Sequence, residues 1–146
     1  MAAVANPAPG TTYRHWNHTY SKLQIFGLTG FERLVFLDAD MLVCANLDEL
    51  FERPHFPAVN AGGLLPEHRD GVTINSGLLV VEPDADRCRE MLSLVGGLPT
   101  RDHGDQTFLH AYFPDWPKRA EPLGQRASRM WYGCEWSAWL RGSVRR

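Results

Sequence analysis

The sequence has no long hydrophobic run and no recognisable secretion signal. Its longest uninterrupted aliphatic stretch is at residues 78–81, whereas a helix that crosses a bilayer needs about 20 apolar residues. The first ten residues lack the basic and apolar segments of a signal peptide. We therefore expect no membrane span and, by default, a cytoplasmic location. If the natural N-terminus is longer, the location is unknown.

Cysteine is also scarce, and positive charge is not in excess. Cys44, Cys88 and Cys134 are widely spaced and odd in number, which is typical of neither a disulfide framework nor a zinc motif. The formal net charge of −2 excludes attraction to nucleic acid by bulk positive charge. This charge is uneven, because residues 1–117 carry −7 and residues 118–146 carry +5. The change of sign separates a basic, Trp-rich tail from the rest.

The length of 146 residues, 44% of them hydrophobic, fits one globular domain of ordinary size. We expect a disordered lead-in at 1–18, a core at 19–117 and the basic tail at 118–146. The sequence contains no phosphate loop, no dinucleotide glycine motif and no nucleophile elbow, which disfavours those enzyme classes.

Strand-like and helix-like segments alternate along the core, which predicts an α/β fold. The pattern predicts a short helix at 20–28, a buried parallel strand at 33–38 and a short helix at 47–52. A second strand at 73–81 contains or adjoins the polar triplet 75–77.

Two further helices are predicted after that strand. One is capped by Asp84 and ended by Gly96 and Gly97, and the next opens at residues 102–106.

Two carboxylates, Asp38 and Asp40, follow the apolar run at 34–37. Ligands of open α/β sheets bind at such strand ends. The two carboxylates repel each other unless a cation lies between them, and hard divalent ions such as Mg²⁺ or Mn²⁺ prefer oxygen ligands. A solvated turn is the competing explanation, because turns favour Asp.

A second polar group surrounds the predicted start of the last helix, where Asp102 and Asp105 flank Gly104 and Gln106 follows. Helix capping explains such carboxylates well, because free backbone amides and the helix dipole stabilise them. In the triplet at 75–77, a polar amide precedes a glycine that permits close approach of a ligand or backbone.

Five motifs occur in order: YSKL at 20–23, LVFLDAD at 34–40, NLDELF at 46–51, INSG at 74–77 and GDQ at 104–106. Their joint pattern resembles glycosyltransferase family 8, especially its glycogenin-like and plant glucuronyl- or galactinol-synthase-like members. The resemblance implies a GT-A type nucleotide-sugar transferase fold, a Rossmann-like mixed sheet flanked by helices. It also implies transfer of a hexose from a UDP-sugar, with retention, to a carbohydrate or glycosylated acceptor, using Mn²⁺ or Mg²⁺.

The resemblance also assigns roles to residues of this sequence. Asp38 and Asp40 would ligate the metal, with Asp38 near the ribose and Ala39 near the nucleoside, and Lys22 would contact the donor sugar or phosphates. It assigns Asp102, Asp105 and Gln106 to catalysis, and Lys22, Asp38, Ala39, Asn75, Ser76 and Gly77 to substrate binding.

Two parts of the family's nucleotide site have no counterpart in the sequence. The residues before Tyr20 do not resemble the family's first nucleotide-binding strand and loop, and no His-x-x-Gly-x-x-Lys segment follows His110. We therefore expect a fold that is incomplete at both ends, with weak or absent activity as written.

Two other functions remain open. One is a non-catalytic derivative that binds sugar or a partner through its basic tail. The other, less favoured, is a haloacid dehalogenase-type phosphatase, since residues 41–43 lack the usual Thr-containing continuation and Leu109 stands where a metal-binding Asp is needed. A homodimer is compatible with the sequence, and nucleic acid is not an expected partner.

Overall fold

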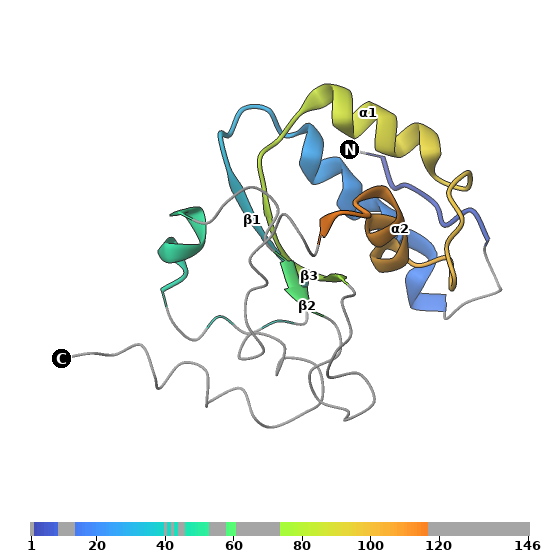
Figure 1. Cartoon of the computed structure of the whole chain (residues 1–146), viewed down its shortest axis with the longest axis horizontal. Coiled ribbons are helices and arrows are strands. Elements are labelled where there is room, and N and C mark those ends of the chain that lie inside the picture. Colours follow the sequence, from blue (N-terminus) through green and yellow to red (C-terminus); the bar gives the residue numbers. More distant parts are fainter. Residues whose placement is uncertain are drawn as a thin grey trace.

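Figure 1 shows the chain as a computed structural model. The structure describes residues 2–8, 14–39, 41, 43, 46–52, 58–60 and 74–116. The elements, in chain order, are η1 (Arg14–Gly27), β1 (Leu34–Leu37), η2 (Asp48–Glu52), β2 (Ala58–Asn60), β3 (Ile74–Val81), α1 (Ala85–Leu94) and α2 (Asp105–Tyr112), where η denotes a 3₁₀ helix. The predicted mixture of helices and strands is confirmed, and the tail at 118–146 lies outside the described residues.

The first helix, η1, has the 3₁₀ form over its whole length of 14 residues. A 3₁₀ helix has three residues per turn, so side chains three apart lie on one face. Tyr20, Leu23 and Phe26 have this spacing, and their exposed fractions are 1%, 0% and 0%. The apolar spacing therefore correctly predicts a helix at 20–28, although the helix begins earlier, at Arg14.

The three described strands form one sheet in the order β1-β3-β2, and both pairings are antiparallel. The prediction of a parallel strand at 33–38 is therefore wrong. That prediction relied on an uninterrupted apolar run, which indicates a strand covered on both faces but not its direction. All four residues of β1 are half-buried at the sheet's edge, whereas β3 occupies the centre and is buried except at Asn75.

Strand β3 contributes to hydrophobic clusters on both faces of the sheet. Leu79 and Val81 pack with η1, α1 and α2, and Leu78 and Val80 pack with Leu50 of η2. Ile74 also packs on the side of η1, α1 and α2, although the alternation of Leu78 to Val81 would place it on the opposite face. The register between β2 and β3 shifts between Ala58 and Val59, and an irregularity of this kind moves later side chains to the opposite face. The polar triplet 75–77 lies inside β3 at this irregularity.

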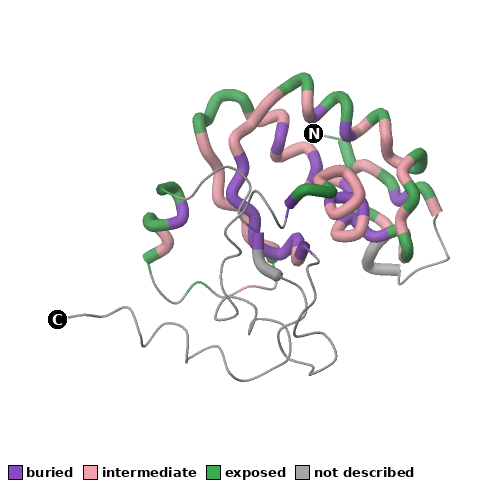
Figure 2. The backbone as a smooth tube through the Cα atoms, in the orientation of Figure 1, coloured by how far each residue is buried: buried purple, intermediate pink, exposed green. Residues whose placement is uncertain are grey.

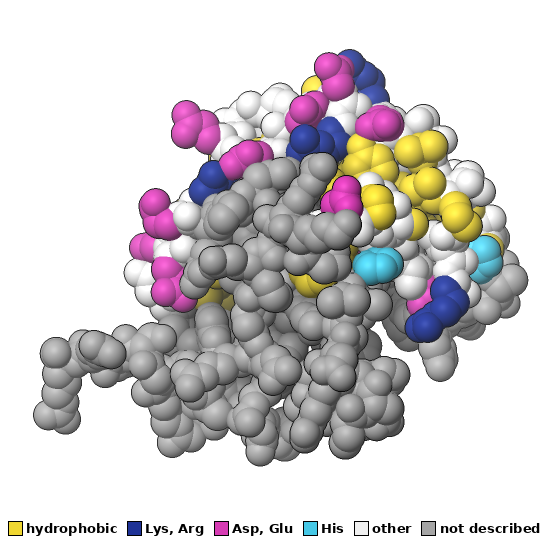
Figure 3. Space-filling model, viewed as in Figure 1, with side chains coloured by type: hydrophobic (Ala, Val, Ile, Leu, Met, Phe, Trp, Pro, Cys, Tyr) yellow, Lys and Arg dark blue, Asp and Glu magenta, His cyan; other side chains and the backbone are white. Residues whose placement is uncertain are grey.

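The helices are divided between the two sides of the sheet. Helices η1, α1 and α2 lie together on one side, and η2 lies on the other, beside β1 (Figure 1). Buried segments follow β3 and the inner faces of the three grouped helices (Figure 2). On the face drawn in Figure 3, charged side chains lie along the top and left edges, and hydrophobic side chains gather on the right below α1.

Helix α1 begins and ends as the sequence predicts. The side chain of its N-cap Asp84 accepts hydrogen bonds from the backbone N–H groups of Asp86 and Arg87. Cys88 and Met91 are buried on its inner face. The turn after the helix contains Gly96, whose φ of +87° lies in the region that favours glycine.

Residues 2–8, for which we expect a disordered lead-in, lie along η1. The amide of Val4 donates to Ser21 Oγ, and the amide of Asn6 donates to the carbonyl of Asn17, each at 2.9 Å. Val4 also packs against the helix-side core. In the part of the chain that is described, no helix has the length and apolar character needed to cross a membrane.

The Asp84 cap predicts a pH-dependent contribution to stability. Hydrogen bonds from the backbone, that of Arg87 first, lower the pKa of Asp84 below its ordinary value of 3.8. Such a carboxyl stabilises the fold above its unfolded pKa, and this stabilisation is lost as the pH falls through the lower folded pKa. Asp84→Asn keeps a capping oxygen without this titration. We expect its urea midpoint to fall less steeply than that of the unsubstituted chain from about pH 4 to about pH 2.

The control for this experiment is Asp86→Asn, which removes a carboxylate from the exposed side of the same helix. It should leave the steep fall in place. Equal slopes for the unsubstituted chain and Asp84→Asn would contradict the prediction.

Candidate functional site

A lysine held between two carboxylates lies where η1, β1, β3 and α2 meet. The side chain of Lys22, in η1, is 9% exposed, and its Nζ lies 3.0 Å from Asp38 Oδ1 and 2.9 Å from Asp105 Oδ2. Asp38 follows β1, and Asp105 is the first residue of α2. A charge with so little access to water is tolerated because it is paired. Two carboxylates against one ammonium leave an excess negative charge.

Ser76 of β3 completes this arrangement. Lys22 Nζ donates to Ser76 Oγ at 3.0 Å and to the Ser76 carbonyl at 3.1 Å. The Ser76 hydroxyl in turn donates to Asp105 Oδ2 at 2.7 Å. One carboxylate oxygen of Asp105 thus accepts from both a lysine and a serine, which fixes its position. We call Lys22, Asp38, Ser76 and Asp105 the Lys22 cluster.

The backbone of Gly77 lies against the more exposed end of this cluster. The Gly77 carbonyl accepts from the Asp38 amide at 2.9 Å, which continues the β1–β3 ladder past the end of β1. A Cβ on Gly77 would stand 3.0 Å from Asn75 Oδ1 and 3.3 Å from Asp38 Oδ2. Glycine therefore allows an amide oxygen and a carboxylate oxygen to approach the same point. The Asp38 side chain is 33% exposed, so this end of the cluster reaches solvent.

Tyr20 lies on the buried side of the cluster. Its ring packs edge-on against Phe108 of α2, with ring centroids 5.5 Å apart, and its hydroxyl donates to the Gly104 carbonyl at 3.5 Å. Burial, together with the nearby Asp105 carboxylate, raises the pKa of Tyr20 to about 12. The phenol is therefore neutral at physiological pH, and it closes the inner side of the site without adding charge.

The structure brings together most of the predicted substrate-binding residues from separate segments. Lys22 contacts both Asp38 and Ser76 directly, and the side chains of Asp38 and Asn75 both lie against Gly77. Ala39 is exposed next to Asp38. Asp40, the second predicted metal ligand, lies outside the described residues.

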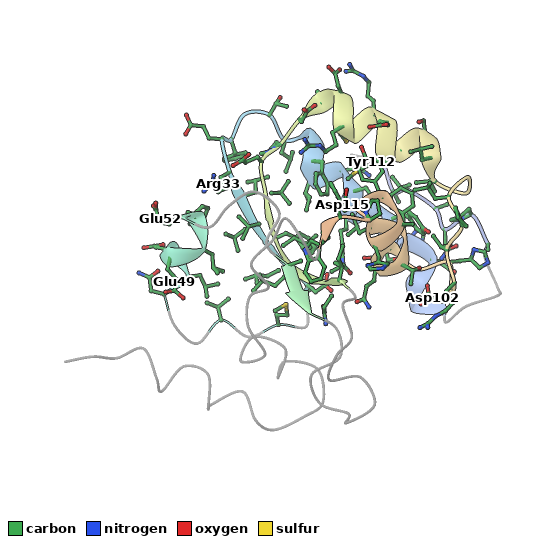
Figure 4. All side chains as sticks on the ribbon, viewed as in Figure 1. Arg33, Glu49, Glu52, Asp102, Tyr112 and Asp115 are labelled. Carbon is green, nitrogen blue, oxygen red and sulfur yellow. The ribbon has the colours of Figure 1, made fainter. Side chains whose placement is uncertain are left out.

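The three predicted catalytic residues have different surroundings. Asp105 belongs to the Lys22 cluster, and Gln106 follows it, half-buried, in α2. Asp102 accepts from the Gly104 amide at 2.9 Å and from the Thr107 hydroxyl, so its side chain contacts the start of α2. Figure 4 shows Asp102 at this end of the helix. Its role in catalysis stays a prediction.

Sequence reasoning missed Phe36. The ammonium of Lys22 lies 5.3 Å from the centroid of the Phe36 ring, within the range of a cation–π contact. Side chains two apart in a strand point to the same face, so the position of Phe36 two residues before Asp38 could have indicated it.

The structure leaves the metal-binding prediction untested. Within the described ranges, no group of three or more His, Cys, Asp or Glu residues could hold a metal ion. The predicted pair contributes only Asp38 to those ranges, because Asp40 lies outside them.

Comparisons with known proteins identify relatives of this chain, although no family model matches it. It is 35% identical to inositol phosphorylceramide glucuronosyltransferase 1 of Arabidopsis thaliana over 117 residues, which cover 80% of this chain and 20% of the relative. It is 32% identical to UDP-glucuronate:xylan alpha-glucuronosyltransferase 1 of the same plant over 136 residues, which cover 90% of this chain and 18% of the relative. It is 37% identical to glycogenin-1 of Mus musculus over 98 residues, which cover 67% of this chain and 28% of the relative.

These relatives define a class of sugar-transferring proteins, and the plant relatives are named glucuronosyltransferases. The chain belongs to glycosyltransferase family 8 and is similar to part of a glycogenin-like domain. It spans about a fifth of the length of the plant relatives.

The ion pair between Lys22 and Asp105 predicts that removing one of the two charges lowers the free energy of unfolding strongly. Removing both charges should lower it less. Lys22→Met leaves the buried carboxylate of Asp105 without its cation, and breaking a buried pair in this way costs about 3–5 kcal/mol. We expect a loss of that size in the free energy of unfolding measured with urea. Adding Asp105→Asn should recover part of it, because the uncompensated charge is then removed.

The control is Arg89→Met, which breaks the exposed Arg89–Asp86 pair of α1. An exposed pair of this kind contributes about 0–1 kcal/mol. Similar losses for Lys22→Met and Arg89→Met would show that the Lys22 cluster is not a buried ionic network.

Proposed function

We propose that this chain is part of a metal-dependent retaining hexosyltransferase that uses a UDP-sugar donor, and that the Lys22 cluster lies in its donor site. The observation that carries the proposal is the convergence of Lys22, Ser76 and Asp105 from three distant segments on one buried network. A network that only stabilised the fold could be replaced by apolar side chains of similar volume, often without loss. Membership of glycosyltransferase family 8 supports the assignment to sugar transfer.

The residues at the exposed end of the site have the chemistry that a hard divalent cation requires. Asp38 Oδ2 and Asn75 Oδ1 flank the point that a Cβ on Gly77 would fill, and both are oxygen donors. In the proposal, Asp38 and Asp40 would hold Mn²⁺ or Mg²⁺. Such an ion supplies positive charge that neutralises a departing diphosphate without a proton donor.

The remaining members of the cluster would act on the sugar end of the donor. Lys22 supplies a second fixed positive charge, which suits a phosphate or sugar oxygen. Asp105 supplies a fixed negative charge, which stabilises the positive charge that develops on the reacting carbon in glycosyl transfer. Because Ser76 and Lys22 hold one Asp105 oxygen, this carboxylate needs little rearrangement at the moment of reaction. The proposal includes both retaining routes, a carboxylate nucleophile and attack on the face of departure.

The proposal also includes the GT-A type fold. Support comes from the small sheet whose strand β1 is followed by Asp38, with η1, α1 and α2 packed on one side. The relatives offer no support for a phosphatase, because those reported above are named as glucuronosyltransferases or as a glycogenin. A non-catalytic derivative is the remaining alternative, and it predicts that substitutions at Asp38 and Asp105 leave binding unchanged.

The direct test is release of UDP by the purified full chain from UDP-glucose and from UDP-glucuronate, with and without Mn²⁺. We expect metal-dependent release with at least one donor. Asp105→Asn should lower it by about 100-fold or more, the effect of removing one preorganised electrostatic group from an active site. UDP binding, measured by calorimetry, should persist in this variant because Asp38 and the metal remain.

The matched control is Asp86→Asn, which removes an exposed carboxylate outside the Lys22 cluster. Its UDP release should equal that of the unsubstituted chain. Absence of both UDP binding at millimolar concentration and UDP release would contradict the proposed activity.

Gly77→Ala tests the exposed end of the site separately from the fold. Alanine suits a strand interior better than glycine does, so the urea midpoint should change little. The new Cβ would displace Asn75 Oδ1 and Asp38 Oδ2 by a few tenths of an ångström. We therefore expect a higher Mn²⁺ concentration for half-maximal UDP release. An unchanged Mn²⁺ requirement would show that these two oxygens are not at the metal.

A further inference from the structure

Residues 2–8, which we call the N-terminal strap, connect η1 to the loop that leads into α2. Gln24 Nε2 donates to the Ala2 carbonyl at 2.6 Å, and Val4 and Asn6 bond to η1 through their amides. At the other end, Pro7 lies against Gly96, where an added Cβ would be 3.1 Å from Pro7 Cβ. The strap thus crosses between elements that are far apart in the sequence.

Asn6 is the buried polar residue of this strap, with an exposed fraction of 3%. Its side-chain Nδ2 donates to the His103 carbonyl at 2.9 Å, and its Oδ1 accepts from the Ala8 amide at 2.9 Å. Both the nitrogen and the oxygen of the side-chain amide are therefore hydrogen-bonded. Losing one partner of a buried hydrogen bond leaves the other unsatisfied, which is more costly than the bond's net contribution.

The carbonyl that Asn6 holds belongs to a strained residue. His103 has a φ of +55° and is the one non-glycine residue with positive φ in the described ranges. This conformation is uncommon for residues other than glycine, and it persists where surrounding contacts fix it. Asn6 holds the carbonyl of His103, and Asp102 Oδ1 holds the next amide, that of Gly104. The two contacts fix the peptide between them.

The turn at His103 sets the direction in which α2 begins. Gly104 is the N-cap of α2, without a side chain to cap the helix, and Asp105 is its first residue. The direction in which α2 begins therefore determines where its first residue places the carboxylate that contacts Lys22 and Ser76. We propose that Asn6 is a positioning residue for Asp105, acting through the His103 carbonyl, an inference that rests on the donor-site function proposed above.

The proposal is tested on the full chain with Asn6→Ala and Asn6→Asp. The aspartate keeps an oxygen for the Ala8 amide but loses the N–H that His103 requires, so both variants should behave alike. The Phe108 amide donates to the Gly104 carbonyl, and its hydrogen exchange therefore reports the first turn of α2. We expect exchange at Phe108 to be about tenfold faster in both variants.

Two further variants separate positioning from general loosening. Gln24→Ala removes another hydrogen bond of the strap, away from His103, and should leave exchange at Phe108 unchanged. His103→Gly combined with Asn6→Ala should restore slow exchange, because glycine adopts a positive φ without strain. The proposal is overturned if Asn6→Ala leaves exchange at Phe108 unchanged, if Gln24→Ala has the same effect, or if His103→Gly gives no rescue.

Kinetics test the link to sugar transfer. A displaced Asp105 should lower kcat for UDP release and leave KM for the UDP-sugar nearly unchanged, and the His103→Gly rescue should recover kcat. A rise in KM at constant kcat would overturn the positioning role. If the unsubstituted chain releases no UDP, the proposed function fails, whereas the exchange experiment still decides whether Asn6 sets the start of α2.

Discussion

The ammonium group of Lys22 is the contact on which the site depends. It is nearly inaccessible to water and faces oxygens of Asp38, Ser76 and Asp105 within 3.3 Å. At this separation, two opposite charges near a protein surface attract by about 5 kcal/mol before desolvation is counted. Desolvation offsets much of that attraction, so the network contributes more to geometry than to stability. It fixes one carboxylate beside a solvent-accessible strand end, where a charged ligand can approach.

The surrounding structure holds the two carboxylates that face Lys22. Asp38 is fixed because the β1–β3 ladder continues through the Gly77 carbonyl. Asp105 is fixed because α2 packs on η1 through Tyr20 and Phe108 and begins at a turn that Asn6 and Asp102 hold. Hydrophobic packing therefore holds the helices together, and polar contacts hold the start of α2.

Much of this could be predicted from the sequence where a pattern is local. The three-residue spacing of Tyr20, Leu23 and Phe26 indicates a helix, and Asp84 with Gly96 marks the ends of α1. Strand direction could not be predicted, because an apolar run shows coverage of both faces and carries no information on its partner. The convergence of Lys22 with Asp105 came from the family resemblance, since no periodicity connects residues so far apart.

Contacts between residues far apart in the sequence could not be predicted for the same reason. Asn6 stands in a Pro- and Ala-rich stretch whose composition favours disorder, yet its side chain pairs with His103, at the other end of the core. His103 itself carries no signal of positive φ, apart from its place beside Gly104. A buried amide and a strained turn that compensate each other are visible only when both are placed in space.

The most direct test of the donor site is paramagnetic broadening by Mn²⁺ in the presence of UDP, followed in amide NMR spectra of the full ¹⁵N-labelled chain. The account predicts that the amides of Asp38 and Gly77 broaden at the lowest Mn²⁺ concentrations, while Ser93, on the exposed side of α1, stays sharp. Broadening that is uniform, or that spares Asp38 and Gly77, would contradict a donor site at the end of β1.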